Sequence, residues 1–321
     1  MDEKSLSSGT GSTPYDDVFR TMLIDCKKLI IPVINEVFGE KYTGDEEVVF
    51  KQNEHFKEQQ DGMLEKIITD SSFQIKGQRT KSYLFECQST EDNSMIIRIF
   101  EYSTQIALDE HSLTANKLTV RVPHSALLLL RSSRNSPDSL MIEIQTPGGN
   151  IEFKVPVMKV KNYTIEEVFE KNLFFLIPFY IFIYESKFSK MEEQREELDI
   201  LKEDYRRIFD RLDEAARNGV ITAYTRKTIF EMSAKVLEKI TLKYDKVKKG
   251  VKSVMGGRVL DHEAKDILNE GRAEGRAEGK AEGKKEMALN LYKQGVKTDV
   301  IAIAAGEAVA VIEKWLGLVS V

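Results

Sequence analysis

The sequence contains few cysteines and histidines. Cys26 and Cys87 are the only cysteines among 321 residues, and the four histidines are scattered at positions 55, 111, 124 and 262. Two cysteines are too few for a disulfide framework, and histidines so far apart do not have the spacing of a zinc site. We therefore predict a protein of the reducing cytoplasm that has no structural zinc.

A strong net charge is also missing. The chain has 47 basic and 52 acidic residues, which gives a formal net charge of −5. This balance excludes a bulk electrostatic attraction to nucleic acid or to an acidic membrane surface. Any polyanion would therefore have to bind at a local basic patch.

Long apolar segments are absent as well. The longest apolar run, LFFLIPFYIFIY at 173–184, contains a proline and ends at Glu185. A helix that crosses a bilayer needs about 20 apolar residues, so we interpret this run as a buried core helix. Residues 1–14 carry acidic residues where a signal peptide would be basic, and we expect this N-terminus to be disordered. No membrane partner is predicted.

The first large zone, residues 15–190, mixes helical and strand patterns. Helical apolar spacing runs from Val18 to a stop at Gly39, and a second helical pattern covers 94–111. Strand-like runs fill much of 65–157, and the consecutive apolar residues of ALLLLR at 126–131 suit a central strand covered on both faces. This order of elements predicts an α/β or α+β fold with a mixed sheet.

Two further zones follow, and both are predicted to be helical. In residues 191–257, an apolar stripe at helical spacing predicts two long antiparallel helices that pack on the core. The first half of residues 258–321 has glycines at every fourth position, 271, 275, 279 and 283. Because each glycine costs a helix about 1 kcal/mol, this segment is either a flexible linker or a helix whose glycine stripe admits a partner helix. Both interpretations remain open.

The end of the tail has the pattern of three short helices. Gly295 and Gly306 separate them, and Thr298 is a predicted helix cap. The spacing resembles a helix-turn-helix, but the last helix has only Lys314 as a basic residue and no Arg, Asn or Gln to read bases. We therefore favour a packing or self-association unit, which would make the protein a homo-oligomer. The apolar residues of this predicted face are Leu291, Val300, Ile301, Ile303, Val311, Ile312 and Trp315.

A hairpin at residues 70–88 carries the candidate chemistry. Glu86 and Gln88 share one face of its second strand, and a turn centred near residue 78 would bring Asp70 opposite Glu86. Two carboxylates there could bind Mg²⁺, which also takes substrate phosphate oxygens. The metal would activate an attacking water, and Gln88 would orient that water. The alternative is a hairpin whose polar face lies in water.

Several motifs in residues 15–190 resemble one nuclease family. They are YDDVFR, TDSSF, LFECQS, SMIIRIFEYSTQIAL and NLFFLIPFYIFIYE, in this order. Together they resemble the PD-(D/E)XK nuclease family of transposase-like proteins, the Rpn recombination-promoting nucleases. The glycine-periodic tail is also similar to C-termini in that family. The resemblance implies an α/β restriction-endonuclease-like mixed sheet flanked by helices, with a C-terminal helical region.

The resemblance also assigns roles within the hairpin. Asp70 matches the metal-binding aspartate and Glu86 the acidic residue of the second strand. Cys87 matches the intervening residue, whose backbone carbonyl often completes the metal shell. Gln88 stands where the family has a lysine, and this departure leaves a neutral amide that acts only through hydrogen bonds.

Two helices would supply the remaining site residues. Asp16 matches an acidic residue that holds a metal-bound water, with Asp17 as the neighbouring candidate. The alternative is an acidic residue that is present only because the helix dipole favours a negative charge at a helix N-terminus. Arg98, Tyr102 and Gln105 share one face of the helix at 94–111. The resemblance places an arginine and a tyrosine at this spacing near the DNA phosphate, whereas the alternative is a salt bridge from Arg98 to Glu86 with Tyr102 packed beside it.

Two functions remain open from the sequence. The first is a Mg²⁺-dependent DNA endonuclease that hydrolyses phosphodiester bonds in transposition or recombination. The second is a catalytically inactive protein of the same fold that binds DNA or serves in assembly. The balanced charge and Gln88 favour the second, whereas Asp70 and Glu86 favour the first. We expect the nuclease.

Overall fold

The computed structural model describes residues 14–50, 54–58, 64–68, 71–90, 92, 94–256, 283–316 and 318, with the backbone alone for 54–58 and 64–68. The chain divides into two compact units, residues 1–259 and 260–321. Asp70 and the glycines at 271, 275 and 279 lie outside the described residues. So does the predicted disordered N-terminus, except for Pro14, which begins the first helix.

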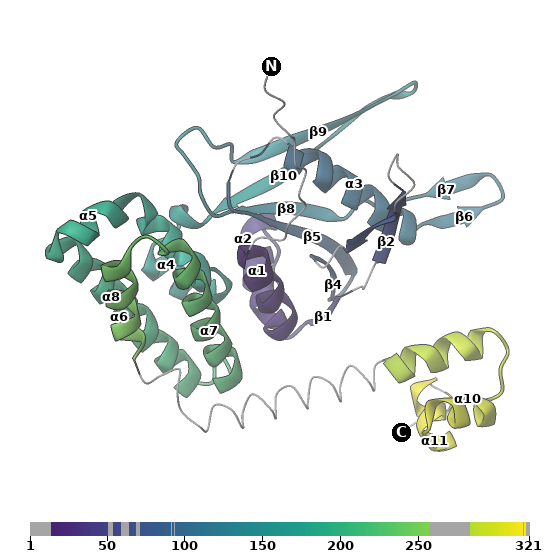
Figure 1. The fold of residues 1–321 in the computed structure, drawn as a ribbon. Coiled ribbons are helices and arrows are strands. Elements are labelled where there is room, and N and C mark those ends of the chain that lie inside the picture. The colour runs from purple at the N-terminus through teal and green to yellow at the C-terminus, as the bar shows by residue number, and fades with distance from the viewer. Residues whose placement is uncertain are drawn as a thin grey trace. The chain divides into compact units, whose positions relative to one another are not determined.

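The first unit is built on a six-stranded mixed sheet with the strand order β1-β4-β5-β8-β10-β9 (Figure 1). Strands β5, β8 and β10 are parallel neighbours, and the outer pairs are antiparallel. The predicted α/β fold with a mixed sheet flanked by helices is confirmed. The strands are β1 (Glu47–Phe50), β4 (Ser72–Lys76), β5 (Thr80–Gln88), β8 (His124–Leu129), β9 (Ser139–Thr146) and β10 (Gly149–Lys159).

Strand β8 is the central strand that the apolar run predicted. Ala126 and Leu128 belong to the hydrophobic core on one face of the sheet, whereas Leu127 and Leu129 belong to the core on the other face. Because both faces are covered, no polar residue is needed at these positions. Two hairpins lie outside this sheet, β2 (Glu54–Glu58) with β3 (Leu64–Ile68), and β6 (Ser112–Thr114) with β7 (Lys117–Thr119).

Helices cover the sheet on both faces. The first face carries α1 (Pro14–Asp25), η1 (Lys27–Leu29) and α2 (Ile30–Phe38), and the second carries α3 (Ser94–Asp109) (Figure 1). As predicted, the first helical region ends at Gly39, whose φ of +66° is the left-handed conformation that glycine adopts without strain.

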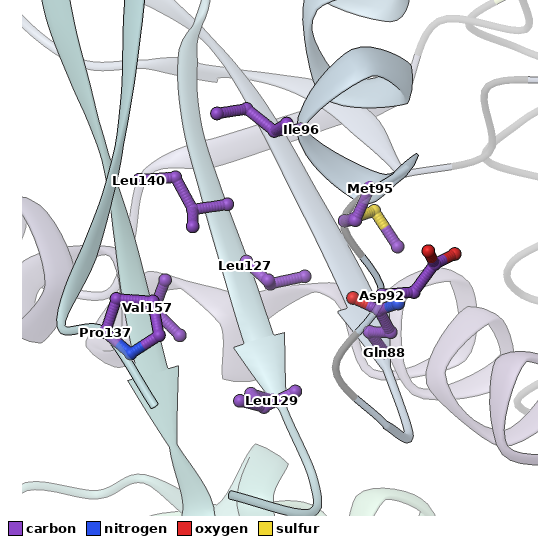
Figure 2. Close-up of a pocket in the computed structure, with 9 residues that line it drawn as sticks. All are labelled: Gln88, Asp92, Met95, Ile96, Leu127, Leu129, Pro137, Leu140 and Val157. Atoms are coloured by element: carbon purple, nitrogen blue, oxygen red, sulfur yellow. The ribbon is translucent and has the colours of Figure 1, made fainter. Parts of the chain in front are cut away.

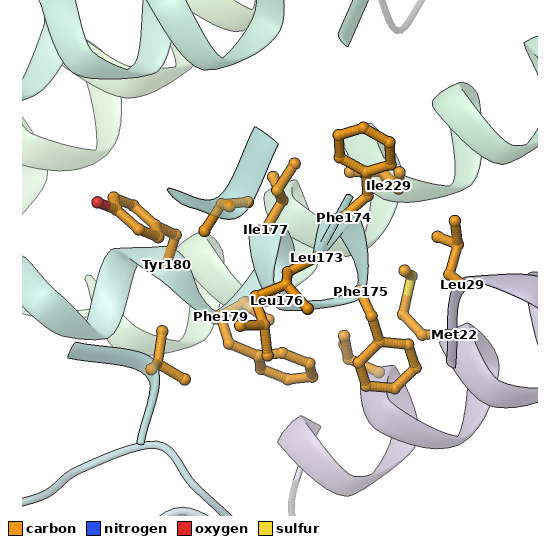
Figure 3. Packing of buried hydrophobic residues seen from close by; sticks show 14 of the residues in the cluster. Met22, Leu29, Leu173, Phe174, Phe175, Leu176, Ile177, Phe179, Tyr180 and Ile229 are labelled. Atoms are coloured by element: carbon orange, nitrogen blue, oxygen red, sulfur yellow. The ribbon is translucent and has the colours of Figure 1, made fainter. Parts of the chain in front are cut away.

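The predicted buried helix is confirmed as η3 (Phe174–Lys187), a 3₁₀ helix whose apolar side chains are buried nearly throughout. It follows η2 (Val160–Asn162) and α4 (Ile165–Glu170). Figure 3 shows Phe175 beside Met22 of α1, and Phe174 beside Ile229 of α7 (Ala223–Ile240). Within the described part of the chain, every helix is too short or too polar to cross a bilayer.

The predicted helical extension shares its core with the sheet. It comprises α5 (Phe188–Glu193), α6 (Arg195–Arg217), α7 (Ala223–Ile240) and α8 (Asp245–Met255). The two predicted long helices are α6 and α7, and Phe209 of one stacks on Phe230 of the other with ring centroids 4.4 Å apart. Helix α7 also packs on α1 and η3, so the bundle supports the face of the sheet that carries α1.

Arg131 supports the start of α1 by lying over the ring of Tyr15. The guanidinium group of Arg131, just after β8, donates from Nε and Nη2 to the two carboxylate oxygens of Glu185, at 2.6 and 2.8 Å. The same guanidinium lies 4.8 Å from the ring centre of Phe182 and 5.7 Å from that of Tyr15. Because Tyr15 precedes Asp16, this stack helps to hold Asp16 near the end of the sheet.

The second unit contains the three predicted short helices: residues 283–293, α10 (Thr298–Ala305) and α11 (Val309–Trp315). The predicted cap is wrong, because Lys297 is the N-cap residue and Thr298 already lies in the helix. The residues of the predicted apolar face do not share one environment, because some are buried and others are exposed. Ile301 and Ile312 form part of a small buried core, whereas the side chain of Ile303 is 83% exposed.

Candidate active site at the end of strand β5

The β4–β5 hairpin has the register that the sequence predicts. Ser72 pairs with Leu84 and Lys76 with Thr80, so the turn is centred on residue 78. Asp70, the predicted partner of Glu86, lies outside the described residues.

Glu86 is the centre of a charged cluster at the end of β5. Its carboxylate is half-buried and accepts a hydrogen bond from Ser71 Oγ. Desolvation raises the pKa of Glu86, and the negative charge of Asp16 adds to this rise. The hydrogen bond from Ser71 and the charges of Arg98 and Arg20 act in the opposite direction. The charges of one acidic and two basic side chains therefore act on the Glu86 carboxylate.

Aromatic packing brings α1 to this cluster. The ring of Phe19 lies 5.7 Å from that of Phe85 on β5 and 5.4 Å from that of Phe175 on η3. Asp16 and Arg20 lie four residues apart on α1 and so project from the same side of the helix. Asp16 also raises the pKa of Cys87, so it lies near two successive residues of β5. The structure thus brings Asp16, rather than the exposed Asp17, to Glu86.

Cys87 faces away from Glu86, and its thiol packs against the core that contains α1. Burial raises the pKa of this thiol well above its ordinary value, so the thiol is neutral at pH 7. The backbone is better placed for chemistry. Phe85 N–H donates to Ser71 O at 3.0 Å, on the β4 side of the strand. Because alternate residues direct their backbone groups to the same side, the Cys87 carbonyl also points to the β4 side, past the first residue of β4, Ser72.

Arg98 and Tyr102, the predicted DNA-binding residues, and Gln105 on the same helix have different surroundings. Arg98 is exposed, and its charge acts on the carboxylates of both Glu86 and Asp92. Tyr102 instead packs against the core between α3 and the sheet. Gln105 donates to Asp109 at 3.3 Å. Arg98 is therefore the residue of α3 whose charge acts on the Glu86 carboxylate.

Gln88 lines a pocket of about 320 Å³ on the α3 face of the sheet (Figure 2). It shares this pocket with Asp92, which lies in the loop between β5 and α3. The Asp92 carboxylate accepts a 2.9 Å hydrogen bond from Ser94 N–H and so caps α3. The other lining residues are Met95, Ile96, Leu127, Leu129, Pro137, Leu140 and Val157.

Three residues of this site were not predicted. Arg20 could have been found from its spacing, because it lies one helical turn after Asp16. Asp92 has a cap signature, an acidic residue just before an apolar helix. Ser71 offered no signal beyond its place after Asp70 in the chain, since its contact with Glu86 depends on how the hairpin pairs.

The donor atoms of the cluster fit a hard divalent cation. Asp16 and Glu86 supply carboxylates, Cys87 supplies a backbone carbonyl, and Mg²⁺ prefers such oxygen ligands. Desolvation is the main cause of the raised pKa of Glu86, and the charge of Asp16 adds to it, so a bound cation would favour the ionised form of Glu86. Among the described residues no group of three or more His, Cys, Asp or Glu side chains could hold a metal, so the fit rests on this smaller set.

Removal of the Glu86 charge is expected to stabilise the metal-free protein. Because the pKa of Glu86 is raised above its ordinary 4.5 by folding, the folded state binds more protons, and stability falls as pH rises through the raised pKa. We expect Glu86→Gln to unfold at a higher temperature than the wild type at about pH 8, and at an equal temperature at about pH 4. Thermal unfolding in EDTA measures this difference. Glu143→Gln, on the exposed edge strand β9, should have no such pH-dependent effect.

Comparisons of this chain with family models, with curated proteins and with solved structures gave no match. The geometry of the Glu86 cluster and the resemblance of the sequence motifs are therefore the two grounds for a function.

Proposed function

We propose that this protein is a divalent-metal-dependent DNA endonuclease that acts in transposition or recombination. The observation that carries the proposal is that the charges of Asp16, Arg20 and Arg98 all act on the Glu86 carboxylate at the end of β5, where Ser71 also donates a hydrogen bond to it. Carboxylates that hold a metal, beside arginines that hold a phosphate, are the parts that phosphodiester hydrolysis requires.

Each side chain has a distinct task in this proposal. Asp16, Glu86 and the Cys87 carbonyl hold Mg²⁺, together with Asp70 as the sequence resemblance implies. When bound, the metal polarises the scissile phosphate and lowers the pKa of an attacking water. Arg98, which is exposed beside Glu86, binds the phosphate through its guanidinium group.

In this proposal Gln88 acts through hydrogen bonds, because its amide carries no charge. It projects from the same face of β5 as Glu86, two residues further along the strand. Its amide can accept a hydrogen bond from a water and can donate one to a phosphate oxygen. It therefore orients the reactants without supplying the positive charge that a lysine would add.

The direct test is incubation of the purified protein with supercoiled plasmid, in parallel reactions with Mg²⁺ and with EDTA. We expect nicked and linear DNA with Mg²⁺ alone. Intact plasmid with Mg²⁺, Mn²⁺ and Ca²⁺ would contradict the nuclease. If the protein then still retards plasmid on a gel, it is an inactive DNA-binding or assembly module instead. The neutral Gln88 at the lysine position favours this alternative.

The Gln88 side chain gives a second test of the same site. We expect Gln88→Ala to lower the nicking rate by about 10²-fold, a typical loss for a positioning group, and Gln88→Lys to keep or raise the rate. Gln105→Ala is the matched control, because that glutamine bonds Asp109 on α3 away from the cluster. Equal rates for all four proteins would exclude a part for Gln88.

The second unit is proposed to mediate self-association. Its core is small, and it leaves Ile303 and Val300 largely exposed. Burial of such residues against a second copy would contribute about 25 cal/mol per Å² of apolar surface. We expect light scattering to give an oligomer for the full chain and a smaller species for a variant lacking residues 258–321. A monomeric mass for both proteins would exclude this role.

A further inference from the structure

We propose that the pocket beside Gln88 receives one nucleobase turned out of the DNA stack, so that the preferred substrate is DNA with an unpaired or easily unpaired base. The inference rests on the proposed function, and it names the substrate class of that site. Enzymes that act on an extruded base hold it in a close-fitting pocket between apolar or aromatic side chains, with polar groups at the base edge.

The size and walls of the pocket suit a base. Its volume of about 320 Å³ lies within the usual range of ligand pockets and exceeds that of a purine ring system. Leu127, Leu129 and Val157 of the sheet face Met95 and Ile96 of α3 across it (Figure 2). Apolar side chains on two opposing elements provide contacts for the two flat faces of a ring.

Two polar groups at the pocket match the edge of a base. The Gln88 amide both donates and accepts hydrogen bonds, and the Asp92 carboxylate accepts them. Adenine and cytosine carry exocyclic amino groups that donate to such acceptors. A phosphate or sulfate in the same place would be repelled by the Asp92 charge, so the chemistry favours a base over an anion.

The position of the pocket fits the geometry of a single nucleotide. Gln88 lies two residues after Glu86 on the same face of β5, which is about 7 Å along a strand. This is about the span between the phosphate and the base of one nucleotide. The charge of Arg98 acts on the carboxylates of both Glu86 and Asp92, so one basic side chain influences both the proposed phosphate site and the pocket.

Two residues that line the pocket are held by contacts within the chain. Asp92 is held by its hydrogen bond to Ser94 N–H at the start of α3, and Met95 is buried one residue later. These two residues would therefore need little rearrangement to contact a base, which lowers the entropic cost of capture.

The test compares two fluorescein-labelled duplexes in EDTA, one with a single bulged adenine and one fully paired. Stacking of one base is worth roughly 1–3 kcal/mol, so we expect the wild type to bind the bulged duplex about 10-fold more tightly by anisotropy. Ile96→Trp fills the pocket and should abolish this preference. Ile97→Trp is the matched control, because Ile97 is the next residue of α3 and is 60% exposed.

A second pocket-filling variant is a control for loss of binding through misfolding. Leu140→Trp fills the pocket from β9 and should abolish the preference as Ile96→Trp does, with circular dichroism used to verify that both variants are folded. Equal affinities of the wild type for the two duplexes, or an unchanged preference in both folded pocket-filling variants, would overturn the inference.

The plasmid assay separates this inference from the proposed function. Nicking of plasmid without any preference for the bulged duplex would overturn base capture and leave the endonuclease in place. A preference for the bulged duplex without nicking would support base capture and remove the endonuclease.

Discussion

Replacement of Glu86 by glutamine is expected to reduce Mg²⁺-dependent plasmid nicking by roughly 10²- to 10³-fold, the loss found when one electrostatic group of an active site is removed. The amide has the shape of the carboxylate but lacks the charge that would bind the cation. Asp16→Asn should have a similar effect, because Asp16 acts on the same carboxylate from α1. Initial rates of plasmid nicking measure both losses.

The matched control for Asp16→Asn is Asp17→Asn. Asp17 is the next residue of α1 and is exposed, so its replacement should leave the nicking rate within about twofold of the wild type. Equal losses in the two variants would show that the cluster at Glu86 does not carry the activity.

Metal binding can be measured without DNA. We expect Mg²⁺ to raise the unfolding temperature of the wild type, because a ligand that binds only the folded state stabilises it. The same concentration of Mg²⁺ should change the unfolding temperature of Glu86→Gln much less. An equal rise in both proteins would place the cation elsewhere.

The largest effect on stability is expected for Phe175→Ala, with a loss of about 3–5 kcal/mol in the free energy of unfolding. The Phe175 side chain is fully buried, and its ring lies 5.4 Å from that of Phe19, and 6.5 Å from those of both Phe85 and Phe179. The substitution would thus leave a cavity at the junction of η3, α1 and β5. Urea unfolding followed by circular dichroism measures this loss.

Phe100→Ala is the control for this substitution. Phe100 lies on α3 and is 37% exposed, so its loss removes less packing and should cost well under half as much. A loss at Phe175 no larger than that at Phe100 would mean that η3 does not hold α1 against the sheet. Since Phe19 links the same three elements, the Phe175 cavity should also lower nicking activity by loosening Asp16.

The sequence alone determined the elements and the register of the hairpin. Alternation of polar and apolar residues in 72–88 is a local property, and so is the polar turn that fixes which residues pair. The apolar runs of β8 and η3 likewise predict burial, because water cannot solvate them favourably in any fold. The choice of Glu86 and Gln88 as neighbours on one face followed from this alternation.

Only the tertiary structure decided which charges meet Glu86. Asp16 and Asp17 are adjacent in sequence, and the packing of Phe19 on Phe85 and Phe175 sets which of them turns toward β5. The same holds for Arg20 and Arg98, which come from helices on opposite faces of the sheet. Such contacts join residues far apart in the chain, so they depend on how whole elements pack rather than on local propensity or spacing.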